Sequence, residues 1–224
     1  MTSLLVTGFE SYGGASANPS AVLARNLDGR MIAGASITGK ILPVSIAQMP
    51  GVLRNLMDDL SPDGILLMGQ WPGESMIRLE RLAINFAEFG IPDNDGAIRT
   101  EPVSAAGAPA LAATWPARRI ERRLLDAGIP ARLSEHAGTF LCNASLYTAL
   151  SHKPAASGLP IGFMHLPYLP QQICELIQAL RAQQQIELFQ RQDLASMALD
   201  MQMHAARLAL EEIVASLDRA AGQE

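Results

Sequence analysis

Short apolar runs alternate with helix-like segments along the chain, and this alternation is the strongest constraint on its fold. One such run lies at 3–7, and comparable runs occur at 64–69 and 161–165. Runs of this length, bounded by turn residues, are typical of buried strands. Because βαβ units build parallel sheets covered by helices, we expect α/β architecture. The prediction is one three-layer α/β/α domain over residues 1–224, with a largely parallel twisted sheet.

Local start and stop signals predict the bounds of the other elements. Asn18 can cap a helix whose first position is Pro19, and Asp28-Gly29 ends that helix. From Pro170 onward we expect helix to the end of the chain, with a weak break at 182–192. Further strands are expected at 36–44 and 131–134, further helices at 50–60, 116–128 and 142–150, and a surface loop at 91–96, while 76–86 is ambiguous.

The charge of the chain argues against a nucleic-acid partner. Its 17 Lys and Arg residues are outnumbered by 22 Asp and Glu residues, which gives a formal net charge of −5. Four arginines lie between 118 and 123, but Glu121 interrupts them, and we expect a solvated helix face there. Phosphate binding requires concentrated positive charge, so no nucleic-acid surface is predicted.

Hydropathy and cysteine content predict a cytoplasmic protein with no membrane partner. No apolar run approaches the roughly 18–20 residues of a membrane span. The first residues carry no basic segment of the kind that opens a signal peptide. Two cysteines, Cys142 and Cys174, are too few for a disulfide framework, so we expect free thiols in a reducing compartment.

Cys142 is the first candidate for covalent chemistry. It follows the turn at Gly138-Thr139 and opens a predicted helix. The positive end of a helix dipole and its unpaired N–H groups favour thiolate over thiol. The alternative, which position alone favours, is a small buried apolar residue. Cys174 lies inside an amphipathic helical segment, where packing is the better interpretation.

His165 is the histidine best placed to act as a base. It stands at the C-terminal end of the predicted strand 161–165, and Leu166-Pro167 stops that strand. Sites of α/β proteins lie at this edge of the sheet. His136 is a reserve candidate because it is close in sequence to the candidate cysteine. Structural or surface roles are expected for the other two histidines.

A Cys–His pair normally needs a third group that orients the imidazole. Spacing does not rank the available acids, and each one alone is more often an exposed charge. Reasoning from residue types therefore ends at a Cys142–His165 couple with no substrate. The acids of the polar middle section are Glu80, Glu88, Asp93 and Asp95.

Signatures of phosphate sites, serine hydrolases and zinc sites are absent from the sequence. It contains no G-x-G-x-x-G, no G-x-x-x-x-G-K-[ST], no G-x-S-x-G and no C-x-x-C. We therefore expect neither a metal nor an organic cofactor.

Four separated segments carry motifs of a known family. They span 4–20, 69–96, 133–147 and 162–170, and a fainter match starts at Ser196. In order and approximate spacing the chain resembles the pyroglutamyl peptidase I (pyrrolidone-carboxylate peptidase) family of cysteine peptidases. The segments read LLVTGFESYGGASANPS, GQWPGESMIRLERLAINFAEFGIPDNDG, LSEHAGTFLCNASLY and GFMHLPYLP.

The resemblance implies a catalytic triad. The family's ERxAxN, AGxxxCN and GFxxH patterns place its Glu, Cys and His at Glu80, Cys142 and His165. Two of these three residues also follow from their positions in predicted elements.

The resemblance also implies a substrate-binding set and partners. Phe9 and Tyr12, in the GFExxGG turn, would hold a pyroglutamyl ring. Asp93, in the IPDN loop, would support the site, and Gln70 completes the set. The implied partners are peptides or small amides with an N-terminal pyroglutamate, and the family often forms homotetramers.

Residues around the expected pocket depart from the family pattern. Ser11 and Tyr12 replace Pro and Phe of GFEPFGG, and 71–74 adds bulk and an acid. About twenty helix-favouring residues predict a helical insertion around 171–192. Further departures are Arg78 for Ser or Thr, His136 for a small residue and Gly90 for Arg.

Three functions are consistent with these residues. The first is removal of an N-terminal pyroglutamyl (5-oxoproline) residue through a thioacyl-enzyme, starting from an imidazolium–thiolate pair of His165 and Cys142. The second is a related thiol hydrolase with another small amide or N-acyl substrate, because the rim is altered. The third, disfavoured by the intact triad, is a non-catalytic relative.

Overall fold

A seven-stranded sheet forms the centre of the computed structural model, which describes residues 1–153, 158–183 and 194–221. Its strands are Ser3–Phe9 (β1), Met31–Ile32 (β2), Ala35–Leu42 (β3), Gly64–Gln70 (β4), Ile77–Glu80 (β5), Ala131–Ser134 (β10) and Ile161–Leu166 (β11). Their order is β10-β5-β11-β4-β1-β3-β2. Strands β3, β1, β4 and β11 are parallel, whereas β5 is antiparallel to β11 and β2 to β3. The predicted largely parallel sheet is confirmed.

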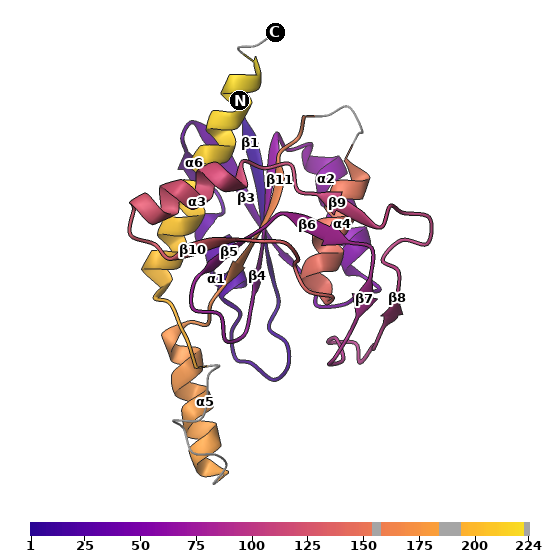
Figure 1. Ribbon diagram of the computed structural model, residues 1–224, viewed down its shortest axis with the longest axis vertical. Coiled ribbons are helices and arrows are strands. Elements are labelled where there is room, and N and C mark those ends of the chain that lie inside the picture. The colour runs from indigo at the N-terminus through magenta and orange to yellow at the C-terminus, as the bar shows by residue number, and fades with distance from the viewer. Residues whose placement is uncertain (154–157, 184–193, 222–224) are drawn as a thin grey trace.

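Helices cover both faces of this sheet (Figure 1). Figure 1 shows α1, α3 and α6 on one side, α2 and α4 on the other, and α5 extending away below the sheet. The predicted three-layer architecture is therefore confirmed. The helices are Pro19–Leu27 (α1), Met49–Leu60 (α2), Ala117–Asp126 (α3), Leu141–His152 (α4), Pro170–Ala182 (α5) and Leu199–Ala221 (α6).

The core consists of one apolar layer on each side of the sheet. Side chains of a strand alternate between faces. On β4, Leu66 and Met68 accordingly pack in the layer with α1, α3 and α6, whereas Ile65 and Leu67 pack in the layer with α2 and α4. All four are fully buried, and each such side chain stabilises the fold by about 1.5–3 kcal/mol. This double burial explains why the strand is free of polar side chains until Gln70, its last residue.

The first βα unit forms as its sequence predicts. The side chain of Asn18 accepts the Ser20 N–H at 3.1 Å, and Pro19 occupies the first turn of α1. The helix start lies directly against β1. A Cβ at Gly8 would lie 2.1 Å from the Ser20 carbonyl oxygen, so this contact requires glycine.

Two small two-stranded antiparallel sheets occupy the segment between β5 and α3. Strand β6 (Leu82–Ile84) pairs with β9 (Ala110–Ala112), and β7 (Ala87–Glu88) pairs with β8 (Thr100–Glu101). The ambiguous stretch 76–86 thus contains β5 and β6. The predicted loop at 91–96 is confirmed.

The C-terminal region differs in part from the prediction of helix from Pro170 to the end with a weak break at 182–192. Residues 194–198 are not helical, and Ser196 forms an isolated parallel bridge with Tyr168. The Met197 N–H also donates to the Tyr168 carbonyl at 2.9 Å, so this backbone is paired outside a helix. Helix α5 covers the first part of the predicted insertion, and 184–192 lies outside the described residues. No helix of the described chain combines the length and apolar content needed to cross a bilayer.

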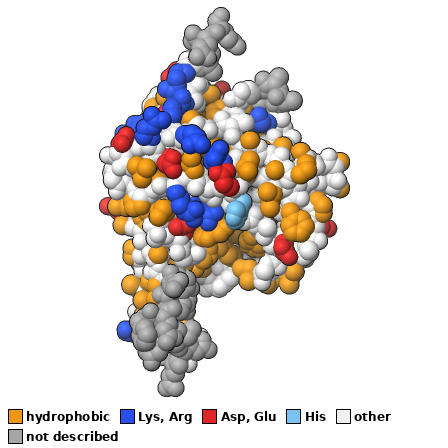
Figure 2. All heavy atoms as spheres, in the orientation of Figure 1, with side chains coloured by type: hydrophobic (Ala, Val, Ile, Leu, Met, Phe, Trp, Pro, Cys, Tyr) orange, Lys and Arg blue, Asp and Glu red, His pale blue; other side chains and the backbone are white. Residues whose placement is uncertain are grey.

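Basic side chains gather over α3 (Figure 2). Arg123 pairs with Glu211 and Glu212 of α6, and Arg119 Nε lies 3.5 Å from Glu212. The predicted solvated face is therefore partly a helix–helix contact, because α6 supplies carboxylates opposite the arginine stripe.

Candidate active site

Strand register places Glu80 and His165 on one face of the sheet. In the β5–β11 pair, Glu80 lies opposite Phe163 and Arg78 opposite His165. Because alternate residues share a face, all four side chains point the same way, and Phe163 packs in the α2 and α4 layer. His165 Nδ1 lies 2.8 Å from Glu80 Oε1, with side-chain exposures of 1% and 0%.

Cys142 reaches the same place from α4. It is the second residue of that helix, and a Cβ at Gly69 would lie 2.6 Å from its Sγ. Gly69 is the β4 residue that pairs with His165. The absent side chain of Gly69 therefore makes room for the sulfur beside the imidazole. The hydrogen bonds of the described residues include none between Cys142 and His165, although both line one cavity.

The first turn of α4 has backbone N–H groups without intrahelical acceptors, and hydrogen bonds of Asn143 hold the turn in place. Its N-cap, Phe140, provides no side-chain cap, so the first N–H groups, including that of Cys142, lack intrahelical acceptors. Asn143 anchors this turn to β6. Its Nδ2 donates to the carbonyls of Ile84 at 2.9 Å and Phe86 at 3.0 Å, and its Oδ1 accepts the Ile84 N–H at 2.9 Å.

Burial governs the protonation of the nucleophile and the base. It raises the pKa of the Cys142 thiol to about 12, and the charge of Glu80 adds to the rise. Burial lowers the pKa of His165, although Glu80 opposes this effect. The site therefore favours a neutral thiol and a neutral imidazole. Both directions oppose the predicted thiolate–imidazolium pair, which stays a prediction.

A cavity of about 440 Å³ lies over the sulfur and the imidazole. One wall is aromatic: Phe140 packs against Phe89 with ring centroids 4.5 Å apart and against Tyr12 at 5.8 Å. On the other side, Trp71 meets the His165 ring edge to face at 4.9 Å. The lining residues are Tyr12, Gln70, Trp71, Pro72, Glu88, Gly90, Ile91, Ala137, Gly138, Thr139, Phe140, Cys142 and His165.

The predicted substrate-binding residues divide into two groups. Tyr12 and Gln70 line the cavity, whereas Phe9 is 3% exposed and packs in the α2 and α4 core layer. Asp93 is also buried, and its carboxylate holds its own loop. Its Oδ1 accepts the N–H groups of Asp95 and Ala97, and its Oδ2 accepts that of Ile46.

The orientation of the Gln70 amide is fixed by Gln172 of α5. Gln172 Oε1 accepts the Leu169 N–H at 2.8 Å, so its Nε2 must be the atom that donates to Gln70 Oε1 at 2.8 Å. The NH₂ of Gln70 is then available to the hydroxyl of Tyr12, with which its side chain bonds. Burial raises the pKa of that hydroxyl, which stays neutral.

The remaining histidines and the second cysteine lie outside the triad. His136 Nδ1 accepts the Gly138 N–H at 3.2 Å and shapes the turn before α4. His152 pairs with Asp58 at 2.7 Å, and His204 is exposed. Cys174 is exposed on α5, at the surface rather than in the core.

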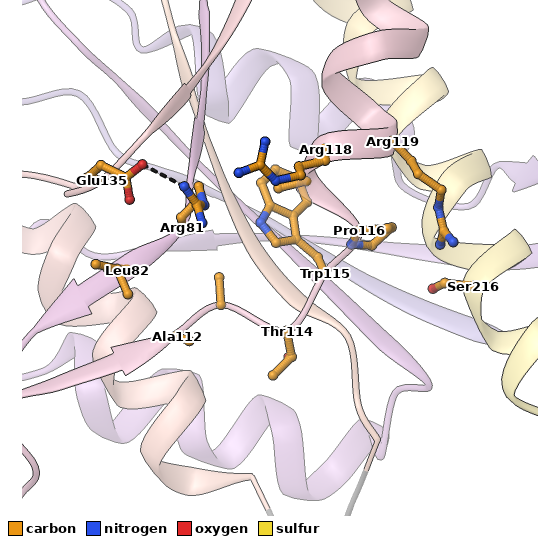
Figure 3. Close-up of a pocket in the computed structure, with 12 residues that line it drawn as sticks. Arg81, Leu82, Ala112, Thr114, Trp115, Pro116, Arg118, Arg119, Glu135 and Ser216 are labelled. Carbon is orange, nitrogen blue, oxygen red and sulfur yellow. Dashed lines mark hydrogen bonds and ion pairs between the residues drawn. The ribbon is translucent and has the colours of Figure 1, made fainter.

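A second cavity, of about 560 Å³, is lined by Trp115, a residue that contacts the backbone of the triad acid (Figure 3). Figure 3 shows Trp115 at its centre and Arg81 turned toward Glu135, 2.7 Å away. Trp115 Nε1 donates to the Glu80 carbonyl at 3.1 Å. This cavity contains no triad side chain, but its tryptophan holds the backbone of the triad acid.

Arg78, Trp71 and Asn143 are parts of the site that their sequence positions do not reveal. Arg78 is 5% exposed, and its guanidinium lies over the Trp71 ring, 3.6 Å from the centroid. The sequence marks the arginine and the tryptophan as departures from a family pattern, and it marks Asn143 as a motif residue. None of these signals indicates a contact.

Comparisons with known proteins agree with this fold. The family model described as "Pyroglutamyl peptidase" matches residues 2–216. The pyrrolidone-carboxylate peptidase of Pyrococcus furiosus is 37% identical over 211 residues, covering 93% of this chain and 96% of that protein. The same-named protein of Thermococcus litoralis is 39% identical over 176 residues, covering 77% and 80%. The solved pyrrolidone carboxyl peptidase from Thermococcus litoralis superposes with a TM-score of 0.89 at 33% identity, over 98% of this chain and 96% of that one.

Proposed function

The chain belongs to the pyroglutamyl peptidase family, and we propose that it removes N-terminal pyroglutamyl residues with Cys142 as nucleophile, His165 as base and Glu80 as orienting acid. The main support is the 2.8 Å contact between Glu80 and His165, because His165 lines the same cavity as Cys142. The site has the groups that amide hydrolysis requires: a thiol, a base and backbone N–H donors without intrahelical acceptors.

The first step transfers one proton and forms one bond. Glu80 Oε1 accepts a hydrogen bond from Nδ1–H of His165, because a carboxylate only accepts. Nε2 of the neutral ring is then a base. As Sγ of Cys142 attacks the carbonyl that follows the pyroglutamyl ring, Nε2 takes the thiol proton. The neutral resting pair therefore reaches the charged state only during attack.

The tetrahedral oxyanion lies at the start of α4. The N–H groups of this turn have no intrahelical acceptor, and the helix dipole adds positive potential. Preorganised donors of this kind are worth about 3–4 kcal/mol each in comparable sites. Asn143 keeps the turn in place through its bonds to the 84–86 backbone.

The imidazolium then returns its proton to the leaving amine, and the C–N bond breaks. A water attacks the thioester with His165 again as base, the C–S bond breaks, and the thiol regains its proton as free pyroglutamate forms. The proton count closes without another reactant.

The aromatic wall suits the ring of the substrate. A lactam is neutral and flat, so it needs an apolar slot with a few hydrogen bonds. Phe140 and Tyr12 provide the slot, and Gln70 with the Tyr12 hydroxyl provides polar contacts. Peptides or small amides with N-terminal pyroglutamate are therefore the proposed substrates. Homo-oligomer formation and cytoplasmic location stay predictions from the sequence.

A fluorogenic pyroglutamyl amide tests the function. We expect the purified protein to cleave it, with no cleavage of the prolyl amide that lacks the ring carbonyl. Cys142→Ser should abolish turnover while the far-ultraviolet circular dichroism and the unfolding midpoint stay unchanged. Equal turnover by wild type and Cys142→Ser would refute the assigned nucleophile.

One observation favours a second candidate, a thiol hydrolase for a related N-acyl substrate. The Tyr12 hydroxyl places an additional polar group in the aromatic wall. A panel of amides with lactam, hydroxylated lactam and acyclic N-acyl groups separates the candidates. Tyr12→Phe should improve cleavage of the unsubstituted lactam only if the hydroxyl serves another substrate.

A further inference from the structure

Arg78 is a buried cation next to the triad that the chemistry above does not use. Its Nε donates to Glu80 Oε1 at 3.1 Å. Its Nη2 donates to Ser134 Oγ at 2.7 Å and to the His136 carbonyl at 3.0 Å. A guanidinium stays charged in proteins, so a position this deep requires a nearby anion and several acceptors.

The first connection from Arg78 to the base passes through one oxygen atom. Glu80 Oε1 accepts from both Arg78 Nε and His165 Nδ1. The other oxygen, Oε2, has no hydrogen-bond partner within the described chain. Arg78 and His165 therefore fix the rotation of this carboxylate together, and Arg78 is the one of the two that lies outside the triad.

The second connection passes through an aromatic ring. The Arg78 guanidinium carbon lies 3.6 Å from the Trp71 centroid, and the Trp71 ring meets the imidazole at 4.9 Å. Gly138 lies against the same indole, since a Cβ there would be 3.4 Å from it. The ring is thus held by the guanidinium while it covers His165 and forms a wall of the cavity.

We propose that Arg78 is a positioning residue of this site: it fixes the Glu80 carboxylate that orients His165, and it clamps the Trp71 ring that covers the imidazole. The proposal rests on the proposed function only in taking His165 as the base for Cys142. Two independent contacts of Arg78 support it, one with Glu80 and one with Trp71, and each of these residues in turn contacts the imidazole of His165.

The charge of Arg78 also acts on His165. The charged and titratable groups around this imidazole are Glu80 and Arg78 of β5, Glu74 of the β4–β5 loop, Cys142 of α4 and, beyond Trp71, His136. Arg78 is the permanent cation of this set, and it opposes protonation of the ring, whereas Glu80 and Glu74 favour it. Loss of the cation should therefore raise the pKa of His165.

Two substitutions separate charge from shape. Arg78→Met removes the charge and keeps much of the volume. Arg78→Lys keeps the charge, but an ammonium cannot stack flat on Trp71 while it contacts Glu80, Ser134 and the 136 carbonyl. Arg81→Met is the matched control, because Arg81 is half-exposed and pairs with Glu135 outside the site.

The measurements are kcat and KM for a pyroglutamyl amide as a function of pH, and the rate of Cys142 alkylation by iodoacetamide without substrate. For Arg78→Met we expect the acidic limb of both profiles to move up by about one pH unit. We expect kcat to fall about ten- to a hundredfold in both Arg78 variants, because orientation is lost. Arg78→Lys should keep the limb of the wild type, and Arg81→Met should match the wild type throughout.

An unmoved limb in folded Arg78→Met, or equal behaviour of Arg78→Met and Arg81→Met, would overturn the proposal. If urea unfolding shows that Arg78→Met does not fold, the test rests on Arg78→Lys. An unchanged kcat in Arg78→Lys would then refute the role of Arg78 in holding Trp71. If the wild type cleaves no pyroglutamyl amide, the alkylation profiles still test Arg78, so failure of the proposed function is distinguishable from failure of this inference.

Discussion

Nδ1 of His165 and Oε1 of Glu80 lie 2.8 Å apart, and both side chains are shielded from solvent. The antiparallel pairing of β5 with β11 creates this contact, because it places the end of β5 beside the imidazole. A carboxylate accepts only, so the contact fixes the tautomer and leaves Nε2 for Cys142. The ring is thereby prepared to act as a base.

Glu80→Gln tests this contact. The amide can donate toward Nδ1 and favour the wrong tautomer, so kcat/KM should fall by about 10²–10⁴. Arg78 also loses the nearer of its two carboxylate partners and keeps Glu74 at 3.8 Å, so the free energy of unfolding should fall by at most about 3–5 kcal/mol. Urea unfolding and steady-state kinetics measure both effects. Glu135→Gln, at an exposed acid, is the control, and activity of Glu80→Gln within threefold of wild type would contradict the assignment.

The pH dependence of activity follows from the buried imidazole. Burial holds the pKa of His165 below its ordinary 6.5, and the base must be neutral. At pH 6.5 more than half of the imidazole should therefore be neutral, and activity should be lost as the pH falls further. Because the folded pKa lies below the unfolded one, the stability contribution of His165 is present above pH 6.5 and is lost on acidification. An acidic limb of kcat/KM above pH 7 would contradict this prediction.

Gly69→Ala tests the space under the nucleophile. The new Cβ would lie 2.6 Å from Cys142 Sγ and 2.9 Å from the Phe163 ring. We expect displacement of the sulfur and a fall in kcat of about a hundredfold. Gly90→Ala is the control, because it lies on the same cavity with nothing within 4 Å of its Cβ. Normal turnover of Gly69→Ala would mean that the sulfur reacts from another position.

Sequence patterns predict the parts of this molecule that depend on local chemistry. The Asn18-Pro19 helix start and the apolar run 64–69 of β4 form as expected, because capping and burial act on neighbouring residues. Cys142 and His165 also follow from their places at a helix start and a strand end. Desolvation is not local, however, and it opposes the expected charge state of this pair.

Strand β5 shows why the rest is not predictable from patterns. Its residues Ile77, Arg78, Leu79 and Glu80 are all buried, yet their alternation of apolar and charged types indicates one solvated face. The two charges neutralise each other inside the protein, which only the tertiary structure arranges. Glu80 is consequently assigned through a family resemblance, and the clamp on Trp71 has no sequence signal.

Gly162→Ala tests the contact between Trp115 and the backbone of Glu80. Gly162 of β11 lies under Trp115, and a Cβ there would be 1.8 Å from the indole. Trp115 cannot keep both its position and its 3.1 Å bond to the Glu80 carbonyl. We expect a loss of about 1–3 kcal/mol in the free energy of unfolding from overpacking, together with a fall in kcat. Gly158→Ala, at an exposed glycine with nothing within 4 Å, is the control for both measurements. Lower stability with unchanged kcat would show that Trp115 serves packing alone, and unchanged stability would show that the strand shifts to admit the methyl group.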